Sequence, residues 1–200
     1  MTSYQFAFAA MALTAVTAVT AQTTQYTTSA AFLAAVVPGA YTETFVDSGF
    51  SGDPDAVFSG GSFSYLVAAP GGLYGNGVFI GTNADNSPLT ITFTGAPVTA
   101  VGGNFYATDV SDAFQGVSVT LTLSNGFTTT FTPTSVANSY RGFTTVLPIA
   151  SLTLGAPGAT RYVGMDNLTV GAVPEPGTWL LMALGAGALL LRQSRRAARA

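Results

Sequence analysis

The chain has 200 residues and a formal net charge of −3, and it contains no cysteine and no histidine. All six of its basic residues are arginines, so it contains no lysine either. These absences exclude Ser-His-Asp and Cys-His nucleophilic sites, zinc sites made of cysteine or histidine, and Schiff-base chemistry. They also exclude disulfide bonds, so the packing of the core must hold the fold together.

Residues 1–21 are predicted to be a secretory signal peptide. Residues 6–21 form a run of apolar and small side chains, and Val19-Thr20-Ala21 fits a small-x-small cleavage site before Gln22. No basic residue precedes this run, which departs from the usual pattern; a different start codon would explain the difference. The alternative is an N-terminal helix that is not cleaved.

Residues 22–172 are predicted to form one domain, because a chain of this length can bury an adequate core. This segment carries eight carboxylates against two arginines, which gives it a net charge of −6. A surface so poor in cations is badly suited to nucleic acid, whose phosphates need Lys and Arg. It is better suited to calcium or to neutral glycans.

The domain is predicted to begin with one short helix over residues 29–37, with Ser29 as a possible N-cap and Pro38-Gly39 as the stop. The sequence patterns of the domain after residue 39 indicate strands. Residues 89–94 and 117–124 alternate between apolar and hydroxyl side chains, as strands with one buried face do. Asn125-Gly126 then predicts a tight hairpin, because both turn residues need positive φ. Further strands are expected at 41–46, 62–67, 77–81, 98–107, 127–131, 143–147, 150–154 and 162–170.

Nine or ten strands separated by short turns predict an all-β fold, an antiparallel β-sandwich. We expect one short N-terminal helix in the domain and a separate hydrophobic helix at the C-terminus. The acidic stretches at 53–55 and 109–112 are expected in turns.

Residues 173–200 contain a short polar motif, an apolar run and a basic end. The motif is Val173-Pro174-Glu175-Pro176, and the run ends at four arginines, Arg192, Arg195, Arg196 and Arg199. A full span needs about 20 apolar residues, whereas residues 177–191 supply 15. The run is therefore short for a permanent membrane anchor. The arginines favour the cytoplasmic side, which places the domain across the membrane.

This order of motif, Leu-rich helix and arginine cluster resembles a PEP-CTERM sorting signal. The resemblance implies recognition by an exosortase, a membrane-embedded cysteine protease of Gram-negative bacteria. It also implies an inner-membrane intermediate, cleavage at or near Pro-Glu-Pro, and release to the cell surface or extracellular matrix. The alternative is an ordinary tail anchor with a proline-containing linker.

The domain itself resembles the ectodomain of many PEP-CTERM proteins. The segments Glu-Thr-Phe at 43–45, Leu-Thr-Ile-Thr-Phe at 89–93, the Asn-Gly hairpin and Met-Asp-Asn-Leu at 165–168 carry this resemblance through their order. It implies a jelly-roll or lectin-like sandwich, similar to a carbohydrate-binding module, with no assigned activity.

Calcium is one candidate ligand, because hard cations bind carboxylates and loop carbonyls. Asp166 and Asn167 are the strongest candidates for a structural calcium site, ahead of the acidic residues at 53–55 and 109–112. The alternative for Asp166 and Asn167 is Asx-type hydrogen bonding to the backbone at a strand kink.

Polysaccharide is the second candidate ligand. The domain has no Trp, so the aromatic platforms would be tyrosines, namely Tyr65, Tyr74, Tyr106, Tyr140 and Tyr162. We expect a non-catalytic surface or matrix protein that binds exopolysaccharide or other matrix components. One alternative is a secreted glycan hydrolase with a carboxylate pair that includes Glu43, the one glutamate of the domain. Another is a structural matrix protein without a specific ligand.

Overall fold

The structure is a computed structural model that describes residues 22–174. The predicted signal peptide with Ala21, and the predicted C-terminal helix of residues 177–191, lie outside the described residues. So do Glu175, Pro176 and the four tail arginines.

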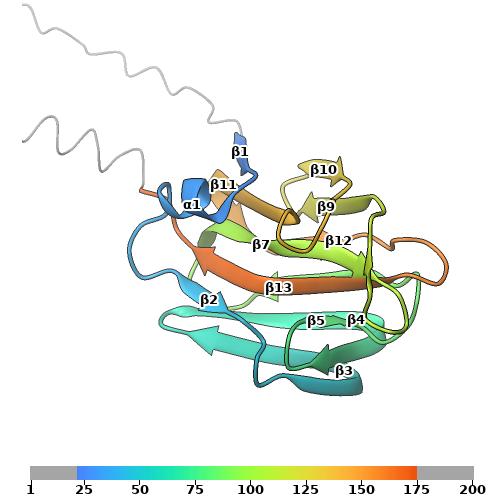
Figure 1. Cartoon of the computed structure of the whole chain (residues 1–200). Coiled ribbons are helices and arrows are strands. Elements are labelled where there is room, and N and C mark those ends of the chain that lie inside the picture. The colour runs from blue at the N-terminus through green and yellow to red at the C-terminus, as the bar shows by residue number, and fades with distance from the viewer. Residues whose placement is uncertain (1–21, 175–200) are drawn as a thin grey trace, which may run out of the picture.

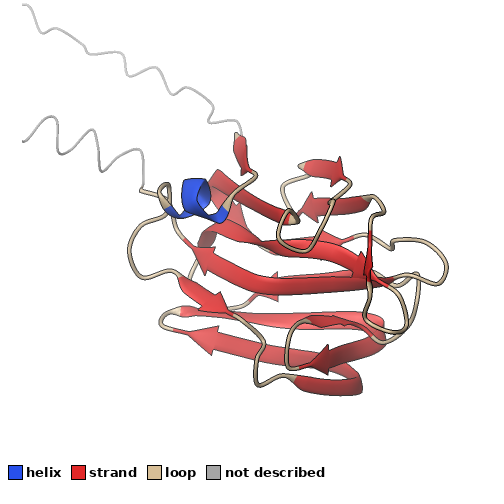
Figure 2. Cartoon of the chain, in the orientation of Figure 1, coloured by secondary structure: helices blue, strands red, loops and turns tan. Residues whose placement is uncertain are grey.

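The described part contains one short helix and otherwise strands and loops (Figure 2). In chain order the elements are β1 (Thr23–Tyr26), α1 (Ser29–Leu33), β2 (Tyr41–Glu43), β3 (Gly49–Gly60), β4 (Phe63–Asn76), β5 (Ile80–Thr82), β6 (Leu89–Phe93), β7 (Val98–Thr108), β8 (Phe114–Gln115), β9 (Val119–Leu123), β10 (Thr128–Phe131), β11 (Tyr140–Ile149), β12 (Ser151–Leu154) and β13 (Tyr162–Gly171).

These strands join in one antiparallel sheet with the order β1-β11-β7-β13-β5-β4-β6-β12-β9-β10. Three further strands pair at its sides: β2 with β13, β3 with β4, and β8 with β7. The sheet curls into a half-barrel (Figure 1). Asn125, in the hairpin turn at one end of this path, donates through Nδ2 to Thr23 Oγ1 in β1 at the other end, at 3.0 Å.

The predicted all-β antiparallel class is confirmed. The described strands form a single curled sheet, where the sandwich prediction expected two sheets packed face to face. Curling brings the apolar sides of distant strands together, so one sheet encloses a core that two sheets would otherwise share. The jelly-roll strand order stays a prediction.

The core is built from the apolar side of each alternating strand. In β9, Val119, Leu121 and Leu123 are buried, whereas Thr122 between them is exposed. The Asn-Gly hairpin also forms, since β10 pairs with β9 and Gly126 has a φ of 88°. The period-two prediction for this region is confirmed.

Helix α1 covers part of the outer side of the sheet. Its one buried side chain, Phe32, packs between the rings of Tyr26 and Tyr140, with centroids at 6.0 and 6.1 Å. Gly142 in β11 makes room for this ring, because a Cβ there would lie 2.6 Å from Phe32 Cδ2. The helix therefore docks where β11 lacks a side chain.

The predicted start of the helix at Ser29 is confirmed, whereas its predicted N-cap and its predicted end were wrong. Thr28 is the N-cap, and its Oγ1 accepts from Ala31 N at 3.3 Å. Ser29 is the first helical residue and does not cap the helix. The helix ends at Leu33, four residues before the predicted end, because the last residues of the stretch turn back toward the sheet and Val37 N donates to Ala172 O at 2.9 Å.

The prediction of a turn at residues 53–55 was wrong, because these residues lie within strand β3. Among the described strands this one pairs only with β4, and its register shifts around Asp53. Pro54 is tolerated there because an edge strand needs no donor on its outer side. Asp53 and Asp55 are exposed, as charged residues on edge strands commonly are.

Candidate functional site

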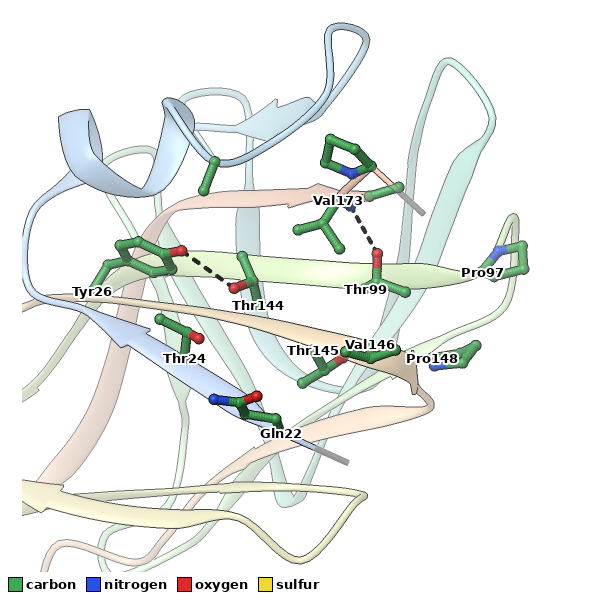
Figure 3. Close-up of a pocket in the computed structure, with 13 residues that line it drawn as sticks. Gln22, Thr24, Tyr26, Pro97, Thr99, Thr144, Thr145, Val146, Pro148 and Val173 are labelled. Carbon is green, nitrogen blue, oxygen red and sulfur yellow. Dashed lines mark hydrogen bonds between the residues drawn. The ribbon is translucent and has the colours of Figure 1, made fainter. Parts of the chain in front are cut away.

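An open groove of about 840 Å³ lies beside both ends of the described chain (Figure 3). The described residues that line it include no charged side chain and several hydroxyl groups. The lining residues used below are Tyr26 from β1, Thr99 from β7, Thr144 from β11, and Val173 and Pro174 from the segment after β13. Tyr26 Oη and Thr144 Oγ1 lie 3.4 Å apart in its wall.

The first two residues of the predicted sorting motif form one side of this groove. The backbone N–H of Val173 donates to Thr99 Oγ1 at 2.9 Å, and its side chain packs against the cluster of Phe32, Ala100 and Tyr140. Pro174 is exposed. The motif therefore starts on the folded domain, with no linker between them.

A second recess, of about 150 Å³, lies where β4, β5 and β13 meet the loop between β7 and β8. Tyr74 and Tyr162 are half-buried at its wall, and Phe79 is buried beside them, its ring centroid 5.9 Å from that of Tyr74. Asp109 and Asp112 of the loop complete the lining. The structure thus brings together two of the predicted glycan tyrosines and one of the predicted acidic pairs.

The two aspartates of this recess have different roles. Asp109 Oδ1 accepts from the backbone N–H groups of Ser111 and Ala113 at 2.9 and 3.1 Å, so it shapes the loop. Asp112 Oδ2 accepts from Tyr74 Oη at 2.7 Å and from Asn76 Nδ2 at 3.1 Å. The hydrogen bond to this carboxylate raises the pKa of Tyr74, so its phenol stays protonated and continues to donate.

The other predicted tyrosines lie elsewhere. Tyr65 is 0 % exposed in the core, and Tyr106 and Tyr140 are also buried. Sequence reasoning missed Phe79 and Asn76 as neighbours of the recess. Asn76 reaches Asp112 of the β7–β8 loop and Phe79 packs on Tyr106 of β7, and no local pattern marked these contacts between distant residues.

Asp166 and Asn167 lie at an irregularity of β13, where the register with β7 shifts and Asn167 has a φ of 52°. Asp166 accepts from Asn167 N at 2.6 Å through Oδ1 and from Asn167 Nδ2 at 2.7 Å through Oδ2. Burial raises the pKa of Asp166. The carboxylate thus bonds to the backbone at a strand irregularity, as the alternative to calcium expected, but to the N–H of the next residue rather than two residues on as in an Asx turn. Within residues 22–174, no three acidic side chains gather into a group that could hold a metal, and calcium at this site stays a prediction.

Glu43 lies at the end of β2 and is already engaged by its neighbours. Its Oε2 accepts from Tyr41 Oη, and its Oε1 accepts from Phe45 N at 2.9 Å. Phe45 has a φ of 54° and is fully buried. The carboxylate therefore helps to hold the tight turn that carries Phe45 into the core. Its role in hydrolysis stays a prediction.

Comparison with known proteins places one family feature on this chain. Residues 172–196 match the PEP-CTERM protein-sorting motif. Neither a curated protein nor a solved structure matches the chain. Within residues 22–174, no helix is long and apolar enough to cross a membrane.

The match confirms the predicted sorting signal, and it begins at Ala172, inside the segment that the structure describes. Such a signal implies processing by an exosortase, export, and sorting to the cell surface.

Proposed function

We propose that this protein is an exported, exosortase-sorted surface protein whose β domain binds a neutral matrix polysaccharide without catalysis. The observation that carries the proposal is the recess of Tyr74, Asp112 and Tyr162, which combines aromatic rings with a positioned carboxylate. Binding sites commonly combine apolar walls with a few placed polar groups.

The chemistry of the recess suits a sugar ring. The tyrosine rings offer apolar faces, and the hydrogen bonds among the described residues use Oδ2 of Asp112 and leave Oδ1 for a ligand hydroxyl. Hydrogen bonds to a charged acceptor are stronger than neutral ones.

At about 150 Å³ the recess is smaller than the pockets of drug-sized ligands, which span roughly 300–1,000 Å³. It therefore suits one ring of a polymer that lies across the surface. The affinity of such binding grows when several protein copies engage the same chain.

Affinity electrophoresis of the mature protein in gels that contain the producer's own matrix polysaccharide tests the proposal. We expect retardation of the wild type and its loss in Tyr74→Ala and Tyr162→Ala. Thr130→Ala, on the exposed face of β10, is the matched control and should be retarded as the wild type is. Wild-type mobility that the polysaccharide leaves unchanged would contradict the proposal. Release of reducing sugar that disappears in Glu43→Gln would instead assign a hydrolase.

The sorting part of the proposal has its own measurement. The intact mass of the exported protein should show that residues 177–200 are absent. A mass that retains the arginine tail would indicate a tail anchor instead.

A further inference from the structure

We propose that the folded domain controls processing of the sorting signal, with Thr99 as the residue that positions it. Thr99 holds Val173 against the sheet, so the processing protease gains full access to the motif only when this contact opens. This inference rests on the proposed sorting by an exosortase. It adds that the contact between Thr99 and Val173 sets the rate of cleavage and keeps the cleavage site from lying before Pro174.

The contacts of the fold continue to the residue before the first proline of the motif. Gly171 is the last residue of β13, paired with Ala100 of β7. Ala172 O then accepts from Val37 N at 2.9 Å, and Val173 N donates to Thr99 Oγ1 at 2.9 Å (Figure 3). Since residues before a proline favour extended backbone, Pro174 supports the extended path of Val173.

The segment Ala172–Pro174, which we call the strap, therefore belongs both to the domain and to the matched sorting motif. A protease that binds its substrate as an extended strand needs free backbone groups on both sides of the bond it cuts. In the strap, Ala172 O and Val173 N are hydrogen-bonded to the domain. Cleavage upstream of Pro174 is blocked while the strap is bound, and cleavage just downstream is hindered.

The distance to the membrane makes this hindrance stronger. Only residues 174–178 separate Val173 from Trp179, the first large apolar side chain of the run. Six Cα steps at about 3.3–3.6 Å span roughly 20 Å when fully extended. The domain and the protease must therefore share a gap of about that length when the run is in the membrane.

Release of Val173 from the sheet is a local event, because it breaks one neutral hydrogen bond and exposes a partly buried side chain without unfolding the sheet. Removing the hydroxyl acceptor of Thr99 destabilises the state in which Val173 is held on the sheet by about the free energy of one such hydrogen bond. This increases the open fraction by roughly twofold to tenfold.

The experiment is a pulse-chase of the full-length chain in a host that carries the exosortase, with loss of the tail followed on gels. Thr99→Val keeps the shape and removes the acceptor, and we expect processing about twofold to tenfold faster. Thr99→Ser keeps the acceptor and is the matched control, which should process at the wild-type rate. Intact mass should place the wild-type C-terminus at Pro174 or beyond.

A second variant does not alter the domain. A Gly-Ser-Gly-Ser insertion between Ala172 and Val173 keeps residues 173–200 contiguous and moves them away from the sheet, and this variant should also be processed faster. Wild-type rates for both Thr99→Val and the insertion would overturn the proposal. If Thr99→Val does not fold, the insertion alone decides. A wild-type chain that is not processed at all would refute the sorting function itself, which is a different outcome.

Discussion

The buried hydroxyl of Tyr65 provides a sharp test of how this core is held together. Tyr65 lies in β4, is 0 % exposed, and stacks on Phe58 with ring centroids 5.5 Å apart. Its hydroxyl is buried and has no hydrogen-bond partner among residues 22–174. We therefore predict that Tyr65→Phe makes the domain more stable.

The magnitude follows from two opposing effects. A buried polar group without a partner costs about 1–3 kcal/mol, and the substitution removes that cost. It also leaves a small void where the oxygen was, which costs a few tenths of a kcal/mol at about 24 cal/mol per Å³. The expected net gain is about 1 kcal/mol. For a domain of this size this raises Tm by roughly 2–4 °C.

Urea unfolding and calorimetry of the mature protein measure this change. Tyr74→Phe is the matched control, because it also removes a phenolic hydroxyl, but one that donates to Asp112 at 2.7 Å. That variant should lose up to about 1 kcal/mol. A loss of more than about 1 kcal/mol in Tyr65→Phe would refute the reasoning, since it would mean that a buried water satisfies the hydroxyl.

Two further predictions concern the hairpin and high pH. Gly126→Ala should lower the free energy of unfolding by about 1 kcal/mol in chemical unfolding, because Gly126 has a φ of 88° with open space around it. Gly49→Ala is the control: the site is equally open but has no positive φ, so stability should change by less than about 0.5 kcal/mol. Equal effects of the two substitutions would contradict the backbone explanation. Burial raises the pKa of Tyr65 and Tyr106 above the usual 10.0. The folded state therefore holds these two phenols protonated, and the stability linked to that protonation is complete below pH 10 and is lost as pH rises further. Calorimetry should show Tm falling above about pH 10, with the phenolate absorbance of Tyr65 and Tyr106 appearing only on unfolding. Titration of these two buried tyrosines in the folded state near pH 10 would contradict this.

Local sequence patterns predicted the strands whose own residues carry the signal. In β6 and β9 the apolar side chains alternate with threonines, and the structure buries Leu89, Ile91 and Leu121 as the pattern indicates. Strand β3 was missed because Gly, Asp and Pro dominate it. It is a strand because the long strand β4 offers its edge, and that partner is chosen by tertiary packing.

The candidate recess likewise combines features that the sequence predicted with features that tertiary packing decided. The sequence supplied the tyrosines and the acidic pairs but gave no means of selecting among them. Tyr74 meets Asp112 across 38 positions of the chain, and Tyr65 is instead enclosed by the core. Which polar residues converge depends on the order in which strands join the sheet, and hydrophobic periodicity does not encode that order.

The sorting signal could be read from the sequence alone, because its motif, apolar run and arginines are contiguous and its chemistry does not depend on a fold. Composition alone also excluded several kinds of site, because cysteine, histidine and lysine are absent from the chain. Only the tertiary structure decided that this signal starts on the domain. The acceptor for Val173 is a threonine 74 positions earlier, and a hydrogen bond between such distant residues exists only because the curled sheet places β7 beside the end of β13.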